Sequence, residues 1–195
     1  EKKPDVIVCI GDFADMPSLS SYDKGKKSFE GRRYTKDIAA AKAGMDALME
    51  PIRKELARQK KNKKKQWKPR FVLTLGNHEY RIERAIECDQ ILDGVISMED
   101  LPYDEWEVYP YLEIVEIGGV AFSHFFTSGV MGRPVGSARA LINKKHTSCV
   151  MGHIQIMDIA FAYKPNGDRL TGLLSGTCYQ HDEDYLGPQG NTHFR

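Results

Sequence analysis

The stretch VIVCIGDFAD, residues 6–15, is an unbroken run of apolar residues that ends in Gly11 and Asp12. Such a run is typical of a strand that is buried on both faces, and the glycine marks the turn at its end. The stretch FVLTLGNHE, residues 71–79, repeats this plan. Between the two, apolar residues recur every three or four positions from Ile38 to Leu56, which predicts a long helix. This β-α-β alternation predicts an α/β fold, a sheet with helices on its faces.

The remaining elements are predicted from shorter patterns. We expect Pro51 to kink the long helix or to begin a second one, and residues 79–95 to be helical. From Tyr111 onward, strand follows strand, and the Gly-rich residues 128–137 form a loop. Pro165 to Asp168 has the composition of a hairpin turn. The strands expected in this half are residues 111–117, 120–126, 148–151, 156–163 and 169–174.

Length and composition favour one globular domain over residues 1–195. The chain has 195 residues, of which 41% are hydrophobic, enough to bury one core. Its apolar runs have the length of strands and fall far short of the roughly 20 residues that a membrane span needs, so we expect no membrane partner. The four cysteines are scattered without a CxxC pair, which favours a reducing, cytoplasmic location.

Positive charge gathers in one segment. The net charge is only +1, yet residues 58–70 hold eight Lys or Arg and no acid, which leaves the rest of the chain acidic. This asymmetry can indicate an anionic partner such as nucleic acid. The ordinary alternative is a solvated helix end and loop, and the segment has only Trp67 to stack on a base.

Polar residues stand at the ends of four apolar runs. They are Asp12 and Asp15, then Asn77 and His78, then His124, and finally His153 with Gln155. In open α/β sheets the carboxyl ends of the strands form the ligand crevice, and oxygen and imidazole donors without thiolate suit Mn, Fe, Zn or Ni. Each residue alone has an ordinary explanation as a cap, a turn residue or a core histidine. Their shared placement at four strand ends favours a metal site.

Together these residues resemble a known family. The series GDFAD at 11–15, GNHE at 76–79, His124 and GHIQ at 152–155 is similar to the GDxxD, GNH[DE], H and GHx[HQ] motifs of the calcineurin-like metallophosphoesterases. The resemblance implies a four-layer α-β-β-α sandwich of two mixed sheets. It also implies two divalent metal ions and the hydrolysis of a phosphomonoester or phosphodiester, in which a metal-bound hydroxide attacks in line.

The resemblance assigns a role to each matched residue. Asp12 would bridge the two metals, and Asn77, His124 and His153 would complete one of them. His78 would act as a general acid or electrostatic stabiliser, oriented by a hydrogen bond to Asp15. Gln155 would be either a metal ligand or a plain turn residue. Glu79 would hold backbone groups and take no part in the chemistry.

The sequence departs from the family pattern in two places. The family begins with a strand that ends in DxH, whose side chains bind the first metal, and no residue before Asp12 supplies it. We therefore expect the chain to be a piece of a domain truncated at both ends, binding one metal weakly and hydrolysing little. Met16 stands where some members have an arginine that grips phosphate, so another arginine would replace it, with Arg81, Arg84 and Arg133 as candidates.

Two other functions remain open from the sequence. A nuclease of the same fold would use the basic segment to hold DNA or RNA, with binding that weakens steeply with salt. A degenerate relative would bind metal or nucleic acid without catalysis, as the missing DxH could indicate. His146, His181 and His193 are expected at the surface. The natural substrate, the metal and the oligomeric state are left undecided by the sequence.

Overall fold

The computed structural model describes residues 3–178, and the chain divides into two compact units between Tyr111 and Leu112. Each unit is described by itself. Together they show a mixed α/β protein with several sheets and three helices, as expected for the fold class. The single domain over residues 1–195 and the four-layer sandwich stay predictions. His181 and His193 lie outside the described residues.

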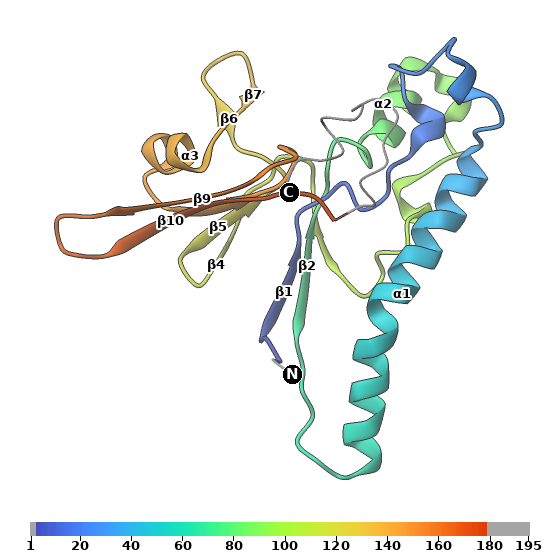
Figure 1. Ribbon diagram of the computed structural model, residues 1–195. Helices are drawn as coiled ribbons and strands as arrows, with labels where there is room; N and C mark the ends of the chain where they lie inside the picture. The colour runs from blue at the N-terminus through green and yellow to red at the C-terminus, as the bar shows by residue number, and fades with distance from the viewer. Residues whose placement is uncertain (1–2, 179–195) are drawn as a thin grey trace. The chain divides into compact units, whose positions relative to one another are not determined.

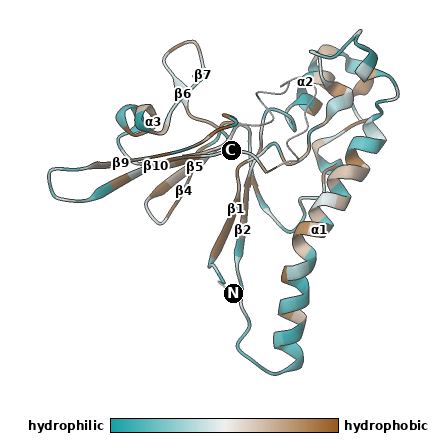
Figure 2. Cartoon of the chain, viewed as in Figure 1, coloured by the Kyte–Doolittle hydropathy of each residue, from teal (hydrophilic) through white to brown (hydrophobic). Residues whose placement is uncertain are grey.

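The first unit is built on a three-stranded parallel sheet in the order β1-β2-β3. Its inner strands are the two predicted apolar runs, which are hydrophobic along their length (Figure 2). The strands are β1 (Val6–Cys9), β2 (Arg70–Thr74) and β3 (Glu107–Tyr109), and the helices are α1 (Tyr34–Lys61) and α2 (Arg81–Cys88). Short 3-10 turns at Pro17–Leu19, Lys27–Phe29, Gln90–Leu92 and Met98–Asp100 complete this unit.

Helix α1 runs beside β1 and β2 (Figure 1) and supplies much of the core of the first unit. Its buried apolar residues recur at the predicted spacing, but Met49 and not Leu48 faces inward. Pro51 lies inside one continuous helix, so the expectation of a second helical segment is wrong. The side chain of Pro51 is exposed, and the carbonyl that it leaves without an amide partner can be hydrated there.

The second unit is built on a five-stranded mixed sheet in the order β4-β5-β8-β10-β9. β5, β8 and β10 run parallel, while β4 and β9 pair antiparallel at the two edges. The strands are β4 (Val115–Ile117), β5 (Val120–Ser123), β8 (Ser148–Met151), β9 (Met157–Tyr163) and β10 (Arg169–Ser175). The turn predicted at Pro165 to Asp168 joins β9 to β10 and is confirmed.

Several predicted boundaries are wrong. The helix expected over 79–95 ends at Cys88, and Ile91, beyond its end, is 81% exposed. The loop expected over 128–137 contains most of a two-stranded hairpin, β6 (Thr127–Ser128) with β7 (Arg133–Pro134). Helix α3 (Ala138–Lys145) was not predicted; Ser137 caps it by accepting a hydrogen bond from the amide of Ala140 at 3.2 Å.

Within the described part of the chain, none of the helices combines the length and the apolar character that crossing a membrane requires. The longest helix, α1, has 28 residues and carries charged side chains along its length. The apolar runs of the sequence form strands, as their length predicted.

Candidate functional site

The ends of β1 and β2 bring two predicted motifs together in the first unit. The strands are parallel, with Cys9 paired to Leu73, so GDFAD and GNHE leave the sheet side by side. A Cβ at Gly76 would lie 2.2 Å from Oδ1 of Asp12, a distance that real side chains do not reach. The two turns therefore pack so closely that Gly76 must be glycine. Asp12 itself has a positive φ of 54°, a conformation that costs energy in a residue with a side chain.

Glu79 ties these turns together from inside the core. Its fully buried carboxylate accepts hydrogen bonds from the amides of Asp12, Phe13 and Ala14 at 2.7–3.0 Å and from the amide of Gly76 at 2.9 Å. The Tyr103 hydroxyl donates a fifth at 3.0 Å. Burial and the neighbouring Glu79 charge raise the pKa of Tyr103, which stays protonated as a donor. The expectation that Glu79 holds backbone groups is confirmed.

His78 lies between two carboxylates. Its Nδ1 is 2.7 Å from Oδ1 of Asp15, and its Nε2 is 3.9 Å from Oδ2 of Asp12. Its backbone amide also donates to Oδ1 of Asp12 at 3.0 Å. The hydrogen bond from His78, more than any other influence, lowers the pKa of Asp15, and the charges of His78 and Arg81 act in the same direction against desolvation. Asp15 is therefore a carboxylate that holds the ring of His78 in place.

Arg81 holds the turn that carries Asp15. Its Nη1 donates to the Asp15 carbonyl at 2.7 Å and lies 3.6 Å from the Asp15 carboxylate. Met16 is almost fully buried and cannot reach a ligand. Of the three arginines considered as phosphate-binding replacements, Arg81 has this structural role, while Arg84 and Arg133 have exposed side chains.

In the second unit, His124 and His153 follow neighbouring strands. β5 and β8 are parallel with Ser123 paired to Met151, so both histidines come at the carboxyl end of the sheet. Their rings meet edge to face with centroids 5.2 Å apart, and a nitrogen of one ring lies within 4.8 Å of a nitrogen of the other. Two imidazoles at this spacing can turn their nitrogens toward one cation.

A tight turn fixes the backbone conformation of His153. The amide of Ile154 donates to the carbonyl of Gly152 at 2.7 Å, and His153 between them has a positive φ of 62°. This is the rare γ-turn with positive φ, a strained conformation of the kind found at functional sites. The amide of Gly152 donates to the carbonyl of His124 at 2.9 Å, which links the two histidine positions. Gln155 follows in the same bend and is half-buried.

The predicted site residues thus fall into two groups. Asp12, Asp15, Asn77 and His78 gather at the strand ends of the first unit, and His124, His153 and Gln155 at those of the second. That the two groups form one metal site stays a prediction.

Sequence reasoning missed Tyr103, which is distant in sequence from the motif that it supports. It also missed Tyr80, which stacks on Tyr111 at 4.8 Å. No sequence signal distinguishes these tyrosines from core residues.

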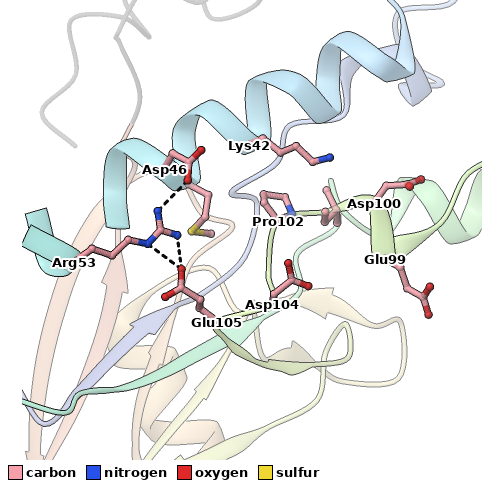
Figure 3. A pocket seen from close by; sticks show the side chains of 10 residues that line it. Lys42, Asp46, Arg53, Glu99, Asp100, Pro102, Asp104 and Glu105 are labelled. Carbon is pink, nitrogen blue, oxygen red and sulfur yellow. Dashed lines mark hydrogen bonds and ion pairs between the residues drawn. The ribbon is translucent and has the colours of Figure 1, made fainter. Parts of the chain in front are cut away.

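A pocket of about 370 Å³ lies elsewhere in the first unit, between α1 and residues 99–105 (Figure 3). Its walls carry both signs of charge. Arg53 lies at one side of the pocket, bound to Asp46 at 3.0 Å and to Glu105. These ion pairs engage three of the charged side chains of the pocket, and none of the predicted site residues lines it.

Comparisons of the chain with models of known families, with curated proteins and with solved structures find no match. The four motifs and the geometry of each unit therefore carry the functional inference.

Proposed function

We propose that the chain is a metal-dependent hydrolase of phosphate esters, a phosphomonoesterase or phosphodiesterase of the calcineurin-like kind. The observation that carries the proposal is the position of His78, held by Asp15 at 2.7 Å with its other nitrogen turned toward Asp12. An ordinary turn has no need of a histidine fixed between two carboxylates. The positive φ angles of Asp12 and His153, both predicted metal ligands, support the same conclusion.

The proposal includes the arrangement of the sheets. We infer the four-layer α-β-β-α sandwich of two mixed sheets that the family resemblance implies. One face of the first sheet joins the core around α1 through Ile7 and Cys9, which leaves Val6 and Val8 for the opposite face. The second sheet has an apolar face along β9, where Ile159 and Phe161 are 50% and 41% exposed. Burial of such faces is favourable, as in a layered sandwich.

The donors fit a divalent cation. Asp12 and Asn77 offer oxygens, His124 and His153 offer imidazole nitrogens, and Gln155 can add an amide oxygen. Asp12 would hold one cation together with Asn77, His124 and His153. It would also be a ligand of the second cation. Two divalent cations, when bound, would lower the pKa of water and neutralise the phosphate oxygens.

His78 would handle the proton of the leaving group. Since Asp15 can only accept, Nδ1 of His78 is the donor in their hydrogen bond, and Nε2 is the nitrogen left for the substrate. A protonated His78 would donate from Nε2 to the departing oxygen. Asp15 would fix the direction of the ring, and a positioned acid speeds bond cleavage.

Hydrolysis of aryl phosphates tests the proposal. We expect slow, Mn²⁺-dependent release of nitrophenol from bis(p-nitrophenyl) phosphate or p-nitrophenyl phosphate, and loss of that activity in Asn77→Ala. Asn143→Ala is the matched control, because Asn143 is exposed on α3 in the second unit. Full activity in Asn77→Ala would overturn the assignment.

A further inference from the structure

The basic segment, residues 58–70, carries more positive charge than its ion pairs neutralise. At its two ends the arginines are paired, Arg58 with Glu55 at 2.6 Å and Arg70 with Glu107 at 2.6 Å. Within the part of the chain that the structure describes, the lysines between them make no ion pair, and all are exposed. They are Lys60, Lys61, Lys63, Lys64, Lys65 and Lys68. Exposed charges without partners, gathered in nine residues, are available to an anion.

Helix stability accounts for only two of these six lysines. Lys60 and Lys61 lie in the last turn of α1, where positive charge favours the helix dipole. The other four follow the helix, in the hydrophilic loop between α1 and β2 (Figure 2). There they repel one another, a cost that an anionic partner would remove.

The lysine loop and the candidate active site of the first unit lie at opposite ends of β2. The loop enters β2 at Arg70, and Asn77 and His78 follow its other end (Figure 1). Five residues of strand separate them by roughly 17 Å, at about 3.3 Å per residue. The loop is therefore a surface distinct from the candidate active site.

Both N–H groups of Trp67 donate hydrogen bonds within the protein. Its indole nitrogen donates to the carbonyl of Pro4 at 2.7 Å, and its amide donates to Oε1 of Gln59 at 2.6 Å. The ring is half-buried in the wall of a groove of about 450 Å³, whose charged lining is Lys3, Lys65 and Lys68 with one carboxylate, Asp5. Since the basic segment has no other aromatic residue, base stacking has no platform here. The segment also lacks the exposed apolar side chains with which a basic surface enters a membrane.

We propose that this lysine loop docks the phosphodiester backbone of double-stranded nucleic acid, without sequence preference. The six unpaired lysines, four in the loop and two in the last turn of α1 before it, match the dense negative charge of a duplex. The docking needs neither metal nor catalysis, so it stands apart from the proposed hydrolase activity. In a chain that also has that activity, docking by the lysine loop would hold a nucleic acid on the surface of the enzyme.

The test is binding of a fluorescent 24-base-pair duplex, measured by anisotropy in EDTA over a series of salt concentrations. We expect log K to fall with log salt at a slope of about −5, because each neutralised phosphate contributes about 0.9. The triple variant Lys63→Gln, Lys64→Gln, Lys65→Gln should reduce the slope by about 3 and weaken binding about 10-fold or more at low salt. The control triple variant, Lys24→Gln, Lys27→Gln, Lys36→Gln, removes three exposed lysines elsewhere in the first unit and should bind as the wild type does.

Two results would overturn the docking proposal. One is the absence of a specific effect of the loop: either the loop variant binds the duplex as tightly as the wild type, or the control variant loses as much affinity as the loop variant. The other is tighter binding to phosphatidylserine vesicles than to the duplex at equal phosphate concentration, which would identify a membrane surface instead. Because EDTA removes all divalent cations, failure of the hydrolase proposal leaves these outcomes unchanged.

Discussion

Asp15 and His78 are in direct contact, with Oδ1 of the carboxylate 2.7 Å from Nδ1 of the ring. They are 63 positions apart in sequence and meet because β1 and β2 end side by side. The contact with Asp15 uses Nδ1 of His78, fixes the direction of the ring and leaves Nε2 for the substrate. The first prediction concerns that nitrogen.

Replacing His78 by Asn should slow hydrolysis most for poor leaving groups. A general acid contributes about 10²-fold or more when the departing oxygen needs a proton, and little for nitrophenol, which leaves as an anion. We therefore expect a large loss of kcat with an alkyl phosphate and a small one with the nitrophenyl ester. His146→Asn is the control, since His146 is exposed and Asn tolerates its positive φ. Equal losses on both substrates would contradict the role of His78.

Removing the buried carboxylate of Glu79 should destabilise the first unit. Four amides and the Tyr103 hydroxyl would lose their acceptor, so Glu79→Ala should lower the free energy of unfolding by about 3 kcal/mol or more. Urea denaturation followed by tryptophan fluorescence measures this. Glu87→Ala, on the exposed face of α2, should change it by less than about 0.5 kcal/mol. A loss in Glu79→Ala no larger than in the control would contradict this account of the turns.

A side chain at Gly76 should damage metal binding as well as stability. The added Cβ would fall 2.2 Å from Oδ1 of Asp12, so Gly76→Ala must displace that carboxylate. We expect a lower melting temperature and a Mn²⁺ affinity reduced about 10-fold or more, as for other losses of ligand orientation. Gly136→Ala has no atom within 4 Å of its new Cβ and should leave both unchanged. Unaltered Mn²⁺ binding in Gly76→Ala would argue against Asp12 as a ligand.

The pair of Tyr34 and Asp100 should make stability depend on pH. The Tyr34 hydroxyl donates to Asp100 at 2.7 Å, and this hydrogen bond lowers the pKa of Asp100 in the folded protein below its usual 3.8. A lowered carboxyl pKa stabilises the fold above about pH 4, and the stabilisation is lost as pH falls through the lowered value. Tyr34→Phe should therefore cost about 1 kcal/mol at pH 7 and less at pH 3, by urea denaturation. Tyr22→Phe, at a 79% exposed position, should cost little at either pH.

The sequence predicted those parts of the fold that depend on local pattern. The apolar runs before Asp12 and Asn77 are strands because they are continuous, and the turn at Asn166 and Gly167 follows from residues that favour turns. Helix α3 was missed because it is only 8 residues long and follows a glycine-rich loop. β3 was missed because its three residues are held by pairing with β2, which is not a local property.

The residues of the candidate site could be predicted from the sequence, but the contacts that hold them in place could not. Asp12, Asn77 and His153 each follow a glycine at a strand end, and His78 follows Asn77, a signal present in the sequence itself. The left-handed backbone of Asp12 and the hydrogen bond from Tyr103 to Glu79 depend on tertiary packing across dozens of residues. Pattern reasoning has no access to such contacts.

The most direct test of the central claim is a Mn²⁺ titration by isothermal calorimetry on the full 195-residue chain. The claim is that Asp12 and Asn77 of the first unit bind one cation together with His124 and His153 of the second. We predict at least one Mn²⁺ per chain in the wild type, and at least about 10-fold weaker binding in both Asp12→Asn and His153→Asn. His146→Asn should bind as the wild type does. Wild-type affinity in either Asp12→Asn or His153→Asn would contradict the claim, because the cation would then not be held by both units.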